Sequence, residues 1–400
     1  MKHIHLLKNS IQEYTWGSYT AIPNLLGTPS PSAKPQAELW MGAHHKAPSL
    51  IKFKNQWQAL DKIIEMHPKE FLGERVADKF LNRLPYLFKI LAASKPLSIQ
   101  AHPSREQAIR GFERENRQGI PLDAYNRNYR DDNHKPECIC ALSDFWALCG
   151  FRRIPEMLLL LSKISTPGLA SAINDLSEKP DSKGLRIFFQ RLITMPKSEA
   201  EAILDKTMAK VSLHLQDDPV FKWMHRLYEE YGNDFGVFSP ILLNLVCLKP
   251  GQALFLASGE LHAYLSGLGI ELMANSDNVL RGGLTPKHMD VEELLKILTF
   301  EEKEIKILTP QKVGECEEIY PSQADEFVLS VLKVKSGNSY QSRDSHNVEI
   351  LICIKGQTRI FEYHAEKVIT LSKGQSVIVP AICGKYCIEG DGILYKAAVP

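Results

Sequence analysis

The sequence lacks several features that define other classes of protein. The chain of 400 residues has no apolar run long enough to cross a bilayer, and its opening stretch "MKHIHLLKNSIQEYTWGS" has no small-residue cleavage site. It also lacks a charge excess, because 48 lysine and arginine residues balance 47 aspartate and glutamate residues. These absences predict a cytoplasmic protein that binds neither nucleic acid nor a membrane, and we expect no obligatory protein partner.

The eight cysteines lack the spacing of a metal or disulfide framework. Cys138 lies close to Cys140, and Cys383 lies close to Cys387, but neither pair has zinc-finger spacing with a second pair to match it. We therefore expect these cysteines to be reduced thiols, as is usual for proteins of the cytosol.

The first part of the chain mixes predicted strands with short predicted helices. Up to about residue 150, "LPYLFKILAASKPLSIQAHP" and "ECICALSDFWALCGF" are typical of strands, whereas "LDKIIEMHPKEFLG" and "ERVADKFLN" are typical of helices. The polar segment "ENRQGIPLDAYNRNYRDDNHKPE" at 115–137 predicts a long surface loop. Loops of this kind often carry function.

From about residue 153 to 235 the hydrophobic period becomes helical. Apolar residues recur at steps of three and four, as at Leu204, Met208 and Val211. A further helix is expected to begin at Pro219, with Asp218 as its N-cap. This stretch predicts a helical domain inserted between two β-rich regions.

A weak internal repeat connects two later stretches of the chain. "KPGQALFLASGELHAYLSG" at 249–267 aligns without gaps with "SKGQSVIVPAICGKYCIEG" at 372–390. A turn, an apolar strand and another turn, twice over, predict two related β-barrels, as in double cupins, although other Gly-Gln strands would match similarly. His262 in the first copy falls on Lys385 in the second, so only the first barrel is expected to keep a ligand-like residue.

We therefore predict a mainly β fold with an α-helical insertion, made of two cupin-like jelly-roll barrels and a helical domain. The predicted units are a discontinuous metal-binding catalytic domain at 1–152 and 238–310, an inserted helical domain at 153–237, and a C-terminal cupin-like domain without a metal site at 311–400. The C-terminal barrel is expected to be structural, so substitution of Lys385 should leave the metal content intact.

Polar residues on apolar strands suggest a metal site. Gln100 and His102 alternate with apolar residues in "PLSIQAHPSREQA", so a strand would point both to one face. Glu137 enters an apolar strand from a polar loop, and His262 lies among apolar neighbours at a strand end. Together they form a nitrogen and oxygen set suited to a divalent ion of the zinc type. Each alone also fits an ordinary structural role, such as a Glu137–Lys135 pair, so spacing does not decide.

Longer motifs resemble those of the type I mannose-6-phosphate isomerases. In chain order they are "KPQAELWMGAHHKAP", "LPYLFKILAASKPLSIQAHPS", "YRDDNHKPE", "FSPILLNLVCLKPGQALFL" and "LHAYLSGLGIELMANSDNVLRGGLTPKHMD". The resemblance implies one Zn²⁺ per chain, held by Gln100, His102, Glu137 and His262. Leu261 and His45 stand where the family often has proline, and neither departure changes a ligand; His45 and its neighbour His44 are treated as misleading metal candidates.

The resemblance also implies an isomerase that interconverts D-mannose 6-phosphate and D-fructose 6-phosphate through an enediolate, and so supplies precursors of mannose-containing glycans. This chemistry needs a base, an acid and fixed positive charge near the developing oxyanion. The residues expected near the reacting carbons are Arg281, Lys135, Asp277, Glu271 and His134. We rank Lys135 first as the base, then Asp277, then Glu271, and assign charge stabilisation to Arg281.

Six further residues are expected to contact the sugar or its phosphate, or to line the pocket. They are Lys89, Ser98, Tyr264, Lys287, Trp16 and Glu38. Trp40 lies in one of the same motifs. Lys287, like Arg281, would without the resemblance be assigned to a solvated turn with surface ion pairs.

Two other functions fit parts of the pattern. A cupin Fe(II) oxygenase would use two histidines and one carboxylate, but such sites commonly place a histidine two positions from a carboxylate, whereas here Gln100 precedes His102. A catalytically silent sugar-phosphate-binding protein would not need the full set of proposed ligands together with Arg281. Survival of activity without oxygen, and turnover of bound sugar phosphate, would separate these alternatives from an isomerase.

Overall fold

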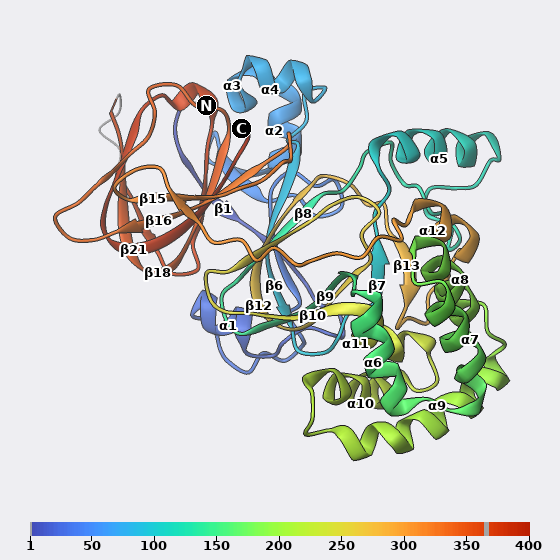
Figure 1. The fold of residues 1–400 in the computed structure, drawn as a ribbon. Helices are drawn as coiled ribbons and strands as arrows, with labels where there is room; N and C mark the ends of the chain where they lie inside the picture. The colour runs from blue at the N-terminus through green and yellow to red at the C-terminus, as the bar shows by residue number, and fades with distance from the viewer. Residues whose placement is uncertain (1, 364–367) are drawn as a thin grey trace.

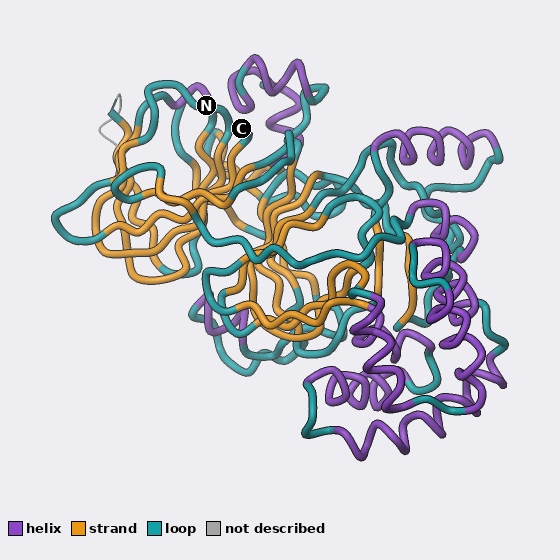
Figure 2. Tube along the Cα trace, in the orientation of Figure 1, coloured by secondary structure: helices purple, strands orange, loops and turns teal. Residues whose placement is uncertain are grey.

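The structure is a computed structural model that describes residues 2–363 and 368–400. Two antiparallel sheets form most of it, and a group of helices packs against one end of the first sheet (Figures 1 and 2). The predicted mainly β fold with a helical insertion is confirmed. None of the helices in the described ranges combines the length and the apolar character needed to span a bilayer.

The first sheet has ten strands and carries most of the residues singled out from the sequence. Its main path runs β10-β9-β12-β6-β3-β2, and β7, β8, β11 and β13 pair onto it. The strands are β2 (Ser10–Gln12), β3 (Glu38–Met41), β6 (Tyr86–Ala93), β7 (Ile99–Ala101), β8 (Glu137–Ala141), β9 (Phe145–Phe151), β10 (Leu243–Leu248), β11 (Ala253–Leu256), β12 (His262–Ala274) and β13 (Leu280–Gly283).

The long strand β12 is the centre of this sheet. Its first half pairs with β7 and β9, and its second half pairs with β6 and β8. The change of partners occurs at Gly267, whose φ is 133° and where a Cβ would lie 2.7 Å from the carbonyl oxygen of Asp144. Because only glycine fits this close approach, the glycine at the end of the repeat's first copy is explained by backbone geometry.

The second sheet has eleven strands, and it is not made from the C-terminal region alone. Its main path runs β14-β15-β16-β21-β18-β20-β1-β4-β5, with β17 and β19 paired onto it. The strands are β1 (His5–Lys8), β4 (Leu50–Phe53), β5 (Gln56–Ala59), β14 (Gln311–Lys312), β15 (Glu317–Tyr320), β16 (Val328–Val334), β17 (Tyr340–Gln341), β18 (Glu349–Glu362), β19 (Val368–Ser372), β20 (Ser376–Val379) and β21 (Tyr386–Ala398).

Three strands from the first sixty residues thus complete the sheet of the C-terminal region. β1 pairs with β20 on one side and with β4 on the other. This pairing crosses the limits predicted for the first and last domains, which remain a prediction.

The helical insertion begins directly after β9. Its helices are α6 (Ile154–Ile164), α7 (Pro167–Glu178), α8 (Ser182–Ile193), α9 (Lys197–Val211) and α10 (Pro219–Tyr231). Asp218 caps α10 by accepting a hydrogen bond from the Val220 amide at 2.8 Å, as predicted. The apolar faces of these helices share one core cluster with Leu261 and Ala263, so the insertion packs directly against the strand that starts at His262.

Short helices and turns connect the remaining strands. They are α1 (Ala21–Leu26), α2 (Leu60–Met66), α3 (Pro68–Leu72), α4 (Glu74–Lys79), α5 (Arg105–Arg117), α11 (Ser239–Leu242), α12 (Val291–Ile297), and the 3₁₀ turns η1 (Ser212–His214), η2 (Phe235–Phe238) and η3 (Ala381–Cys383). Between α5 and β8 the described chain forms neither helix nor strand, in agreement with the predicted long loop.

The two copies of the sequence repeat have the same local structure. In each copy the glutamine side chain closes the turn before the strand, because Gln252 accepts from the Lys249 amide at 2.8 Å and Gln375 accepts from the Ser372 amide at 2.8 Å. Gly390 also matches Gly267, with a φ of 123° and a close backbone neighbour. The repeat found in the sequence therefore corresponds to two equivalent turn-and-strand units.

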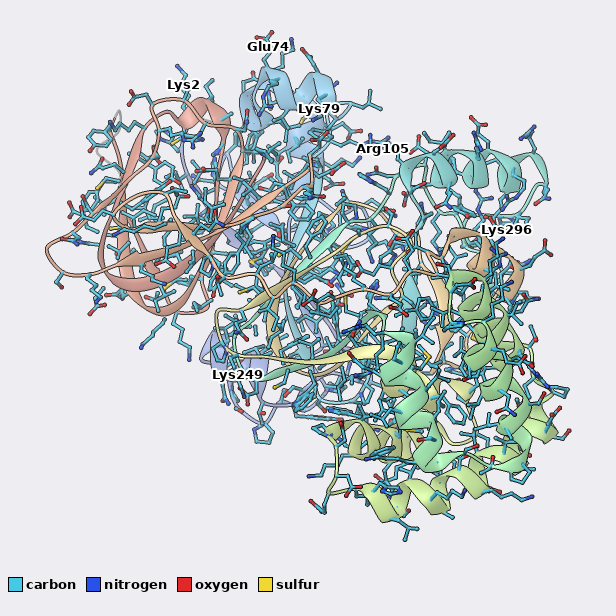
Figure 3. All side chains as sticks on the ribbon, in the orientation of Figure 1. Lys2, Glu74, Lys79, Arg105, Lys249 and Lys296 are labelled. Carbon is cyan, nitrogen blue, oxygen red and sulfur yellow. The ribbon has the colours of Figure 1, made fainter. Side chains whose placement is uncertain are left out.

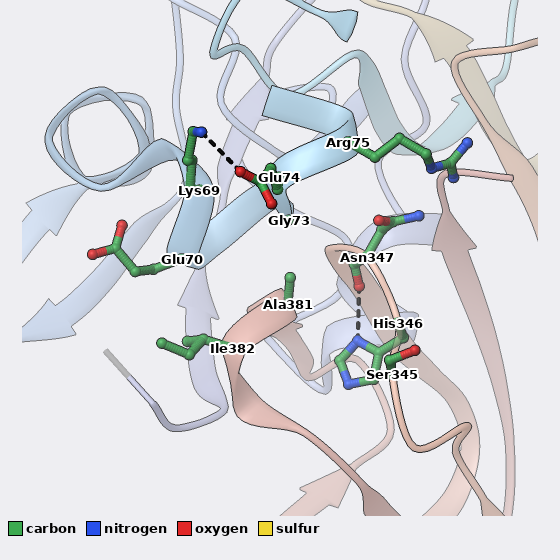
Figure 4. A pocket seen from close by; sticks show the side chains of 10 residues that line it. All are labelled: Lys69, Glu70, Gly73, Glu74, Arg75, Ser345, His346, Asn347, Ala381 and Ile382. Atoms are coloured by element: carbon green, nitrogen blue, oxygen red, sulfur yellow. Dashed lines mark hydrogen bonds and ion pairs between the residues drawn. The ribbon is translucent and has the colours of Figure 1, made fainter. Parts of the chain in front are cut away.

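A polar pocket of about 570 Å³ lies where α3 and α4 meet the C-terminal sheet (Figure 4). Its lining includes Arg75 and His346, and its lysine, Lys69 of α3, is paired with Glu74 of α4 at 3.1 Å (Figure 4). Its lining includes none of the residues singled out from the sequence, so we take the functional site to be elsewhere.

Candidate metal centre and active site

His102, Glu137 and His262 come together in the interior of the ten-stranded sheet. One potential ligand atom from each lies within 4.8 Å of the other two. Glu137 stands between the two histidines, with Oε1 3.1 Å from His102 Nε2 and Oε2 3.5 Å from His262 Nε2. All three side chains are at most 1% exposed, so this is a buried group of metal-ligating side chains.

The tautomers of the two histidines favour a cation between them. His102 Nδ1 lies 2.8 Å from the Asn278 carbonyl oxygen, and His262 Nδ1 lies 2.9 Å from the Glu260 carbonyl oxygen. A carbonyl oxygen only accepts, so each Nδ1 donates its proton and each Nε2 keeps its lone pair. Both Nε2 atoms are buried without a hydrogen-bond partner among the described residues. Lone pairs facing a carboxylate are repulsive unless a cation lies between them, so the donor set fits a divalent ion.

The electrostatics of this group point the same way. Burial, together with the charge of Lys135, outweighs the attraction of Glu137 and lowers the pKa of His102 to about 4, so the imidazole is neutral. Burial would raise the pKa of Glu137, but Lys135, whose Nζ lies 2.9 Å from Oε1, helps to hold it well below its usual range. Tyr264 donates to the other oxygen of Glu137 at 3.1 Å. A neutral histidine and an ionised carboxylate are the forms that bind metal.

Gln100 is placed beside this group by strand pairing. In β7 it lies directly opposite His262 of β12 on one side and opposite Arg281 of β13 on the other. Residues directly opposite in an antiparallel pair have their side chains on the same face. Gln100 therefore shares a face with His262 and Arg281, and its role as a fourth ligand remains a prediction.

A second buried charge group, on β3, β6 and β12, lies near the first. Lys89 Nζ is 2.8 Å from Glu271 and 3.8 Å from Glu38, and Trp40 donates to Glu38 at 2.6 Å. Burial lowers the pKa of Lys89, but these two carboxylates and Glu137 raise it more, so the ammonium stays charged. Burial raises the pKa of Glu271, with Glu137 and Glu38 adding to the effect and Lys89 opposing it.

Asp277 is paired with residues of the loop that follows β3. Its carboxylate lies 2.8 Å from Lys46 Nζ and 3.5 Å from His44 Nε2, and although burial alone would raise its pKa, these two partners lower it. His44, His45 and Asp277 form a second cluster of ligand-type residues. His44 Nδ1 accepts from the Lys46 amide, so its Nε2 carries the proton, and Lys46 already neutralises Asp277; this cluster therefore has no need of a metal.

Three cations gather at the end of β13. Burial and the nearby charge of Arg130 lower the pKa of Arg281, and burial together with Arg281 and Arg130 lowers the pKa of Lys287. The charges that act on Arg281 and Lys287 are thus those of other cations. A group of cations that repel one another is suited to an anion such as a phosphate.

The structure adds two residues that the sequence did not single out. Arg130 was overlooked although it lies in the quoted motif "YRDDNHKPE", where its charge was the available signal. Asn278 is fully buried; its side-chain amide donates to the main-chain carbonyl oxygens of Asp131 at 2.8 Å and Asn133 at 2.9 Å, while its main-chain carbonyl accepts a hydrogen bond from His102 Nδ1. Asn278 thus connects the long loop to His102, an arrangement that depends on the pairing of distant segments.

The remaining predicted contacts are less well placed for chemistry. Trp16 packs against the core cluster that contains Tyr264, and Tyr264 is 2% exposed although its hydroxyl contacts Glu137, so their contact with a substrate remains a prediction. Ser98 is half-buried just before β7. His134 does not join the metal-ligating group but bonds to Glu326, at 2.8 Å.

Comparison with known proteins agrees with this architecture. The family model described as phosphomannose isomerase type I, catalytic domain, matches residues 4–154, and the mannose-6-phosphate isomerase cupin domain matches residues 317–398. The chain is 40% identical over 395 residues to mannose-6-phosphate isomerase of Escherichia coli (strain K12), with 98% of both chains covered. It is 31% identical over 425 residues to the enzyme of that name from Rattus norvegicus, covering 98% of this chain and 94% of the relative.

Solved structures show the same similarity over the whole length. A mutant of phosphomannose isomerase from Salmonella typhimurium has a TM-score of 0.92 and 38% identity, with 99% of both chains covered. A zinc-bound holo structure of mannose 6-phosphate isomerase has a TM-score of 0.90 and 39% identity over 99% of both chains. With the sequence identity spread over nearly the entire chain and the fold shared throughout, the protein belongs to the type I phosphomannose isomerase family.

Proposed function

We infer that the protein is a zinc-dependent aldose–ketose isomerase that interconverts D-mannose 6-phosphate and D-fructose 6-phosphate. The observation that carries this inference is the buried pair of unprotonated imidazole nitrogens facing the Glu137 carboxylate. The relatives named mannose-6-phosphate isomerase and the zinc-bound similar structure support both the activity and the metal.

We propose that the ion is held by His102, Glu137 and His262, with Gln100 as a fourth ligand. Such an ion, when bound, supplies positive charge for an oxygen of the sugar that becomes anionic during enolisation. Neutral His102 and the ionised Glu137 carboxylate are already in their ligating forms, so the site needs little rearrangement on binding.

The cations at the end of β13 would hold the substrate. Arg281 lies opposite Gln100 in the sheet, next to the proposed ligands, whereas Lys287 is exposed on the loop beyond. With Arg130 they offer an anchor for the 6-phosphate at one side of the metal-ligating group. Arg281 is then close enough to the sugar to stabilise developing negative charge, because arginine stays ionised throughout.

The base that takes the proton is proposed in the order Lys135, Asp277, Glu271. Lys135 contacts a proposed ligand, so it lies at the reacting end of the site, but as an ammonium paired with Glu137 it must lose a proton to act. Asp277 is ionised, and so already in its basic form, although Lys46 holds one of its oxygens. Glu271 is buried against Lys89. Replacing each in turn and following exchange of substrate hydrogen with solvent identifies the base as the variant that loses exchange while still binding substrate.

The proposed activity is tested by metal analysis together with an isomerase assay on the wild type and on His262→Ala. We expect about one zinc per chain and production of fructose 6-phosphate in the wild type, and loss of both in the variant. His225→Ala is the matched control. His225 lies on α10 of the helical insertion, does not belong to the metal-ligating group, and has a side chain that is 37% exposed. A wild type that binds the sugar phosphate without forming product would contradict the proposal.

We also propose a cytoplasmic protein that binds no nucleic acid or membrane and needs no other protein for activity. The balanced charge of the chain supports this, as do its eight cysteines, which form no disulfide in the described ranges. Its substrate is a hexose 6-phosphate.

A further inference from the structure

Glu326 is a buried carboxylate that contacts α5 and the loop before β8 from a distant part of the chain. It lies between β15 and β16 of the eleven-stranded sheet, and its side chain is 0% exposed. Its Oε1 accepts a hydrogen bond from Arg105 Nη2 at 2.6 Å and lies 2.8 Å from His134 Nε2. These partners are 221 and 192 residues away in the sequence.

Both partners adjoin proposed metal ligands. Arg105 is the first residue of α5, three positions after His102, and His134 is three positions before Glu137. The start of α5 is fixed by a capping box, so the position of Arg105 is coupled to the backbone that follows His102. Figure 3 shows Arg105 at the end of α5 nearest the strands. One carboxylate thus connects the two loops that carry two of the ligands.

The charge of Glu326 makes this connection firm. Burial would raise the pKa of its carboxyl, but the hydrogen bond to His134 and the charges of His134 and Arg105 outweigh burial and lower it. The carboxylate is therefore ionised, and hydrogen bonds from Arg105 and His134 to it are of the charge-assisted kind. His134 Nε2 also lies 3.2 Å from Arg105 Nη2, so the three side chains form one compact group.

We propose that Glu326 is a positioning residue for the active site: by holding Arg105 and His134 together, it fixes the loops that present His102 and Glu137. The C-terminal region then takes part in catalysis through this contact, beyond supporting the fold. The inference rests on the proposed isomerase function. Partners that orient ligands in this way commonly affect metal affinity or activity by 10-fold or more.

The test compares Glu326→Ala, Glu326→Gln and the adjacent control Asp325→Asn. Asp325 pairs with Lys79 at 3.0 Å on the surface and is 74% exposed, so the control removes one negative charge at the neighbouring position. We expect kcat of Glu326→Ala to fall by about 10-fold, with KM within about twofold, and a chelator to strip zinc about 10-fold faster. Glu326→Gln keeps an acceptor oxygen and should recover part of both losses, and Asp325→Asn should match the wild type.

The proposal is overturned if Glu326→Ala unfolds at lower temperature yet keeps wild-type kcat and chelator resistance below that temperature, because the role would then be structural. Should Glu326→Ala fail to fold, Arg105→Met tests the same contact from its exposed end and should lower kcat with the same unchanged KM. Wild-type kcat in folded Arg105→Met would then reject the proposal. A wild type without isomerase activity would instead refute the proposed function, while the rate of zinc loss would still report on the contact.

Discussion

The two sheets share a common plan but balance their buried charges differently. In the ten-stranded sheet Ile139, Glu271 and Lys89 are direct neighbours across three strands. The sequence repeat identifies their counterparts in the eleven-stranded sheet, because it aligns Leu254 with Val377. Leu254 pairs with Ile139 and Val377 pairs with Leu351, so Ile139 corresponds to Leu351. The corresponding row there is Leu351, Lys396 and Ser330. The same pairing matches Glu137 with Glu349, and Glu38 with Glu317.

Lys396 is therefore a cation at the position of an anion, Glu271. Its Nζ lies 2.8 Å from Glu317, 3.3 Å from Glu349 and 2.7 Å from the Tyr340 hydroxyl. In the first sheet the carboxylate of Glu137 instead faces two unprotonated histidine nitrogens. The comparison teaches that one frame can hold equivalent buried glutamates in different surroundings: Glu137 lies against Lys135 and two histidine nitrogens, whereas Glu349 lies against Lys396. In the C-terminal sheet the neutralising cation is the side chain of Lys396.

The strongest test of this comparison makes the same substitution at both equivalent glutamates, Glu137 and Glu349. Glu137→Gln should lose zinc and reduce kcat/KM at least ~10³-fold, because a ligand and its charge are removed. Glu349→Gln should keep zinc and activity while lowering stability. Metal analysis, the isomerase assay and denaturant unfolding on both variants give the answer; equal loss of zinc in the two would show that the sheets are not divided in this way.

Removing the internal cation should be the most destabilising change in the C-terminal sheet. Lys396→Met leaves the buried Glu349 and the half-buried Glu317 without this positive partner, at a cost of about 3 kcal/mol in the free energy of unfolding. Urea unfolding measures this cost. The double variant Lys396→Met/Glu349→Gln should regain part of it because one unpaired charge is removed, and an additive loss would indicate that the pairing contributes nothing.

Chelation should distinguish the two sheets within one molecule. A ligand present at 100 times its Kd stabilises the folded state by about 2.7 kcal/mol, so stripping zinc should lower hydrogen-exchange protection in β7, β8 and β12. Protection in β18 and β21 should be unchanged, because their charge partner is Lys396. Uniform loss of protection across both sheets would contradict this separation.

The smallest effect is expected at Lys385, the residue aligned with His262 in the sequence repeat. Its side chain is 38% exposed and pairs with Asp344 at 3.1 Å, so it lies outside the buried charge group. Lys385→Ala should change stability by less than about 0.5 kcal/mol and leave zinc content and kcat/KM unaltered. Metal analysis and thermal unfolding beside the wild type test this, and zinc loss would reveal a connection between the sheets that the structure does not show.

Local patterns in the sequence predicted much of this molecule. The helical period and the Asp218 cap located the insertion. The polar residues singled out on apolar strands included His102, Glu137 and His262, which come together in the structure. The reason is physical: capping, periodicity and a polar side chain on an apolar strand are properties of short segments.

The register between distant strands could not be predicted in the same way. Glu271 lies four residues after Gly267, whereas Lys396 lies six residues after Gly390, so an ungapped alignment matches Lys385 with His262 and hides the match of Lys396 with Glu271. Glu326 was missed for a similar reason, since its neighbours in sequence say nothing about Arg105 and His134. Long-range contacts depend on the whole topology rather than on any one segment.

The first strand of the chain has a consequence for how the protein is made. Because β1 lies between β20 and β4, the opening residues can be seated only after the last hundred have emerged from the ribosome. Until then β1 can pair with β4 only, and the part of its backbone that pairs with β20 has no partner. A C-terminal fragment that begins at residue 311 would lack β1, so the edge of β20 that pairs with β1 would be exposed. The two parts of the chain therefore depend on each other to complete this sheet.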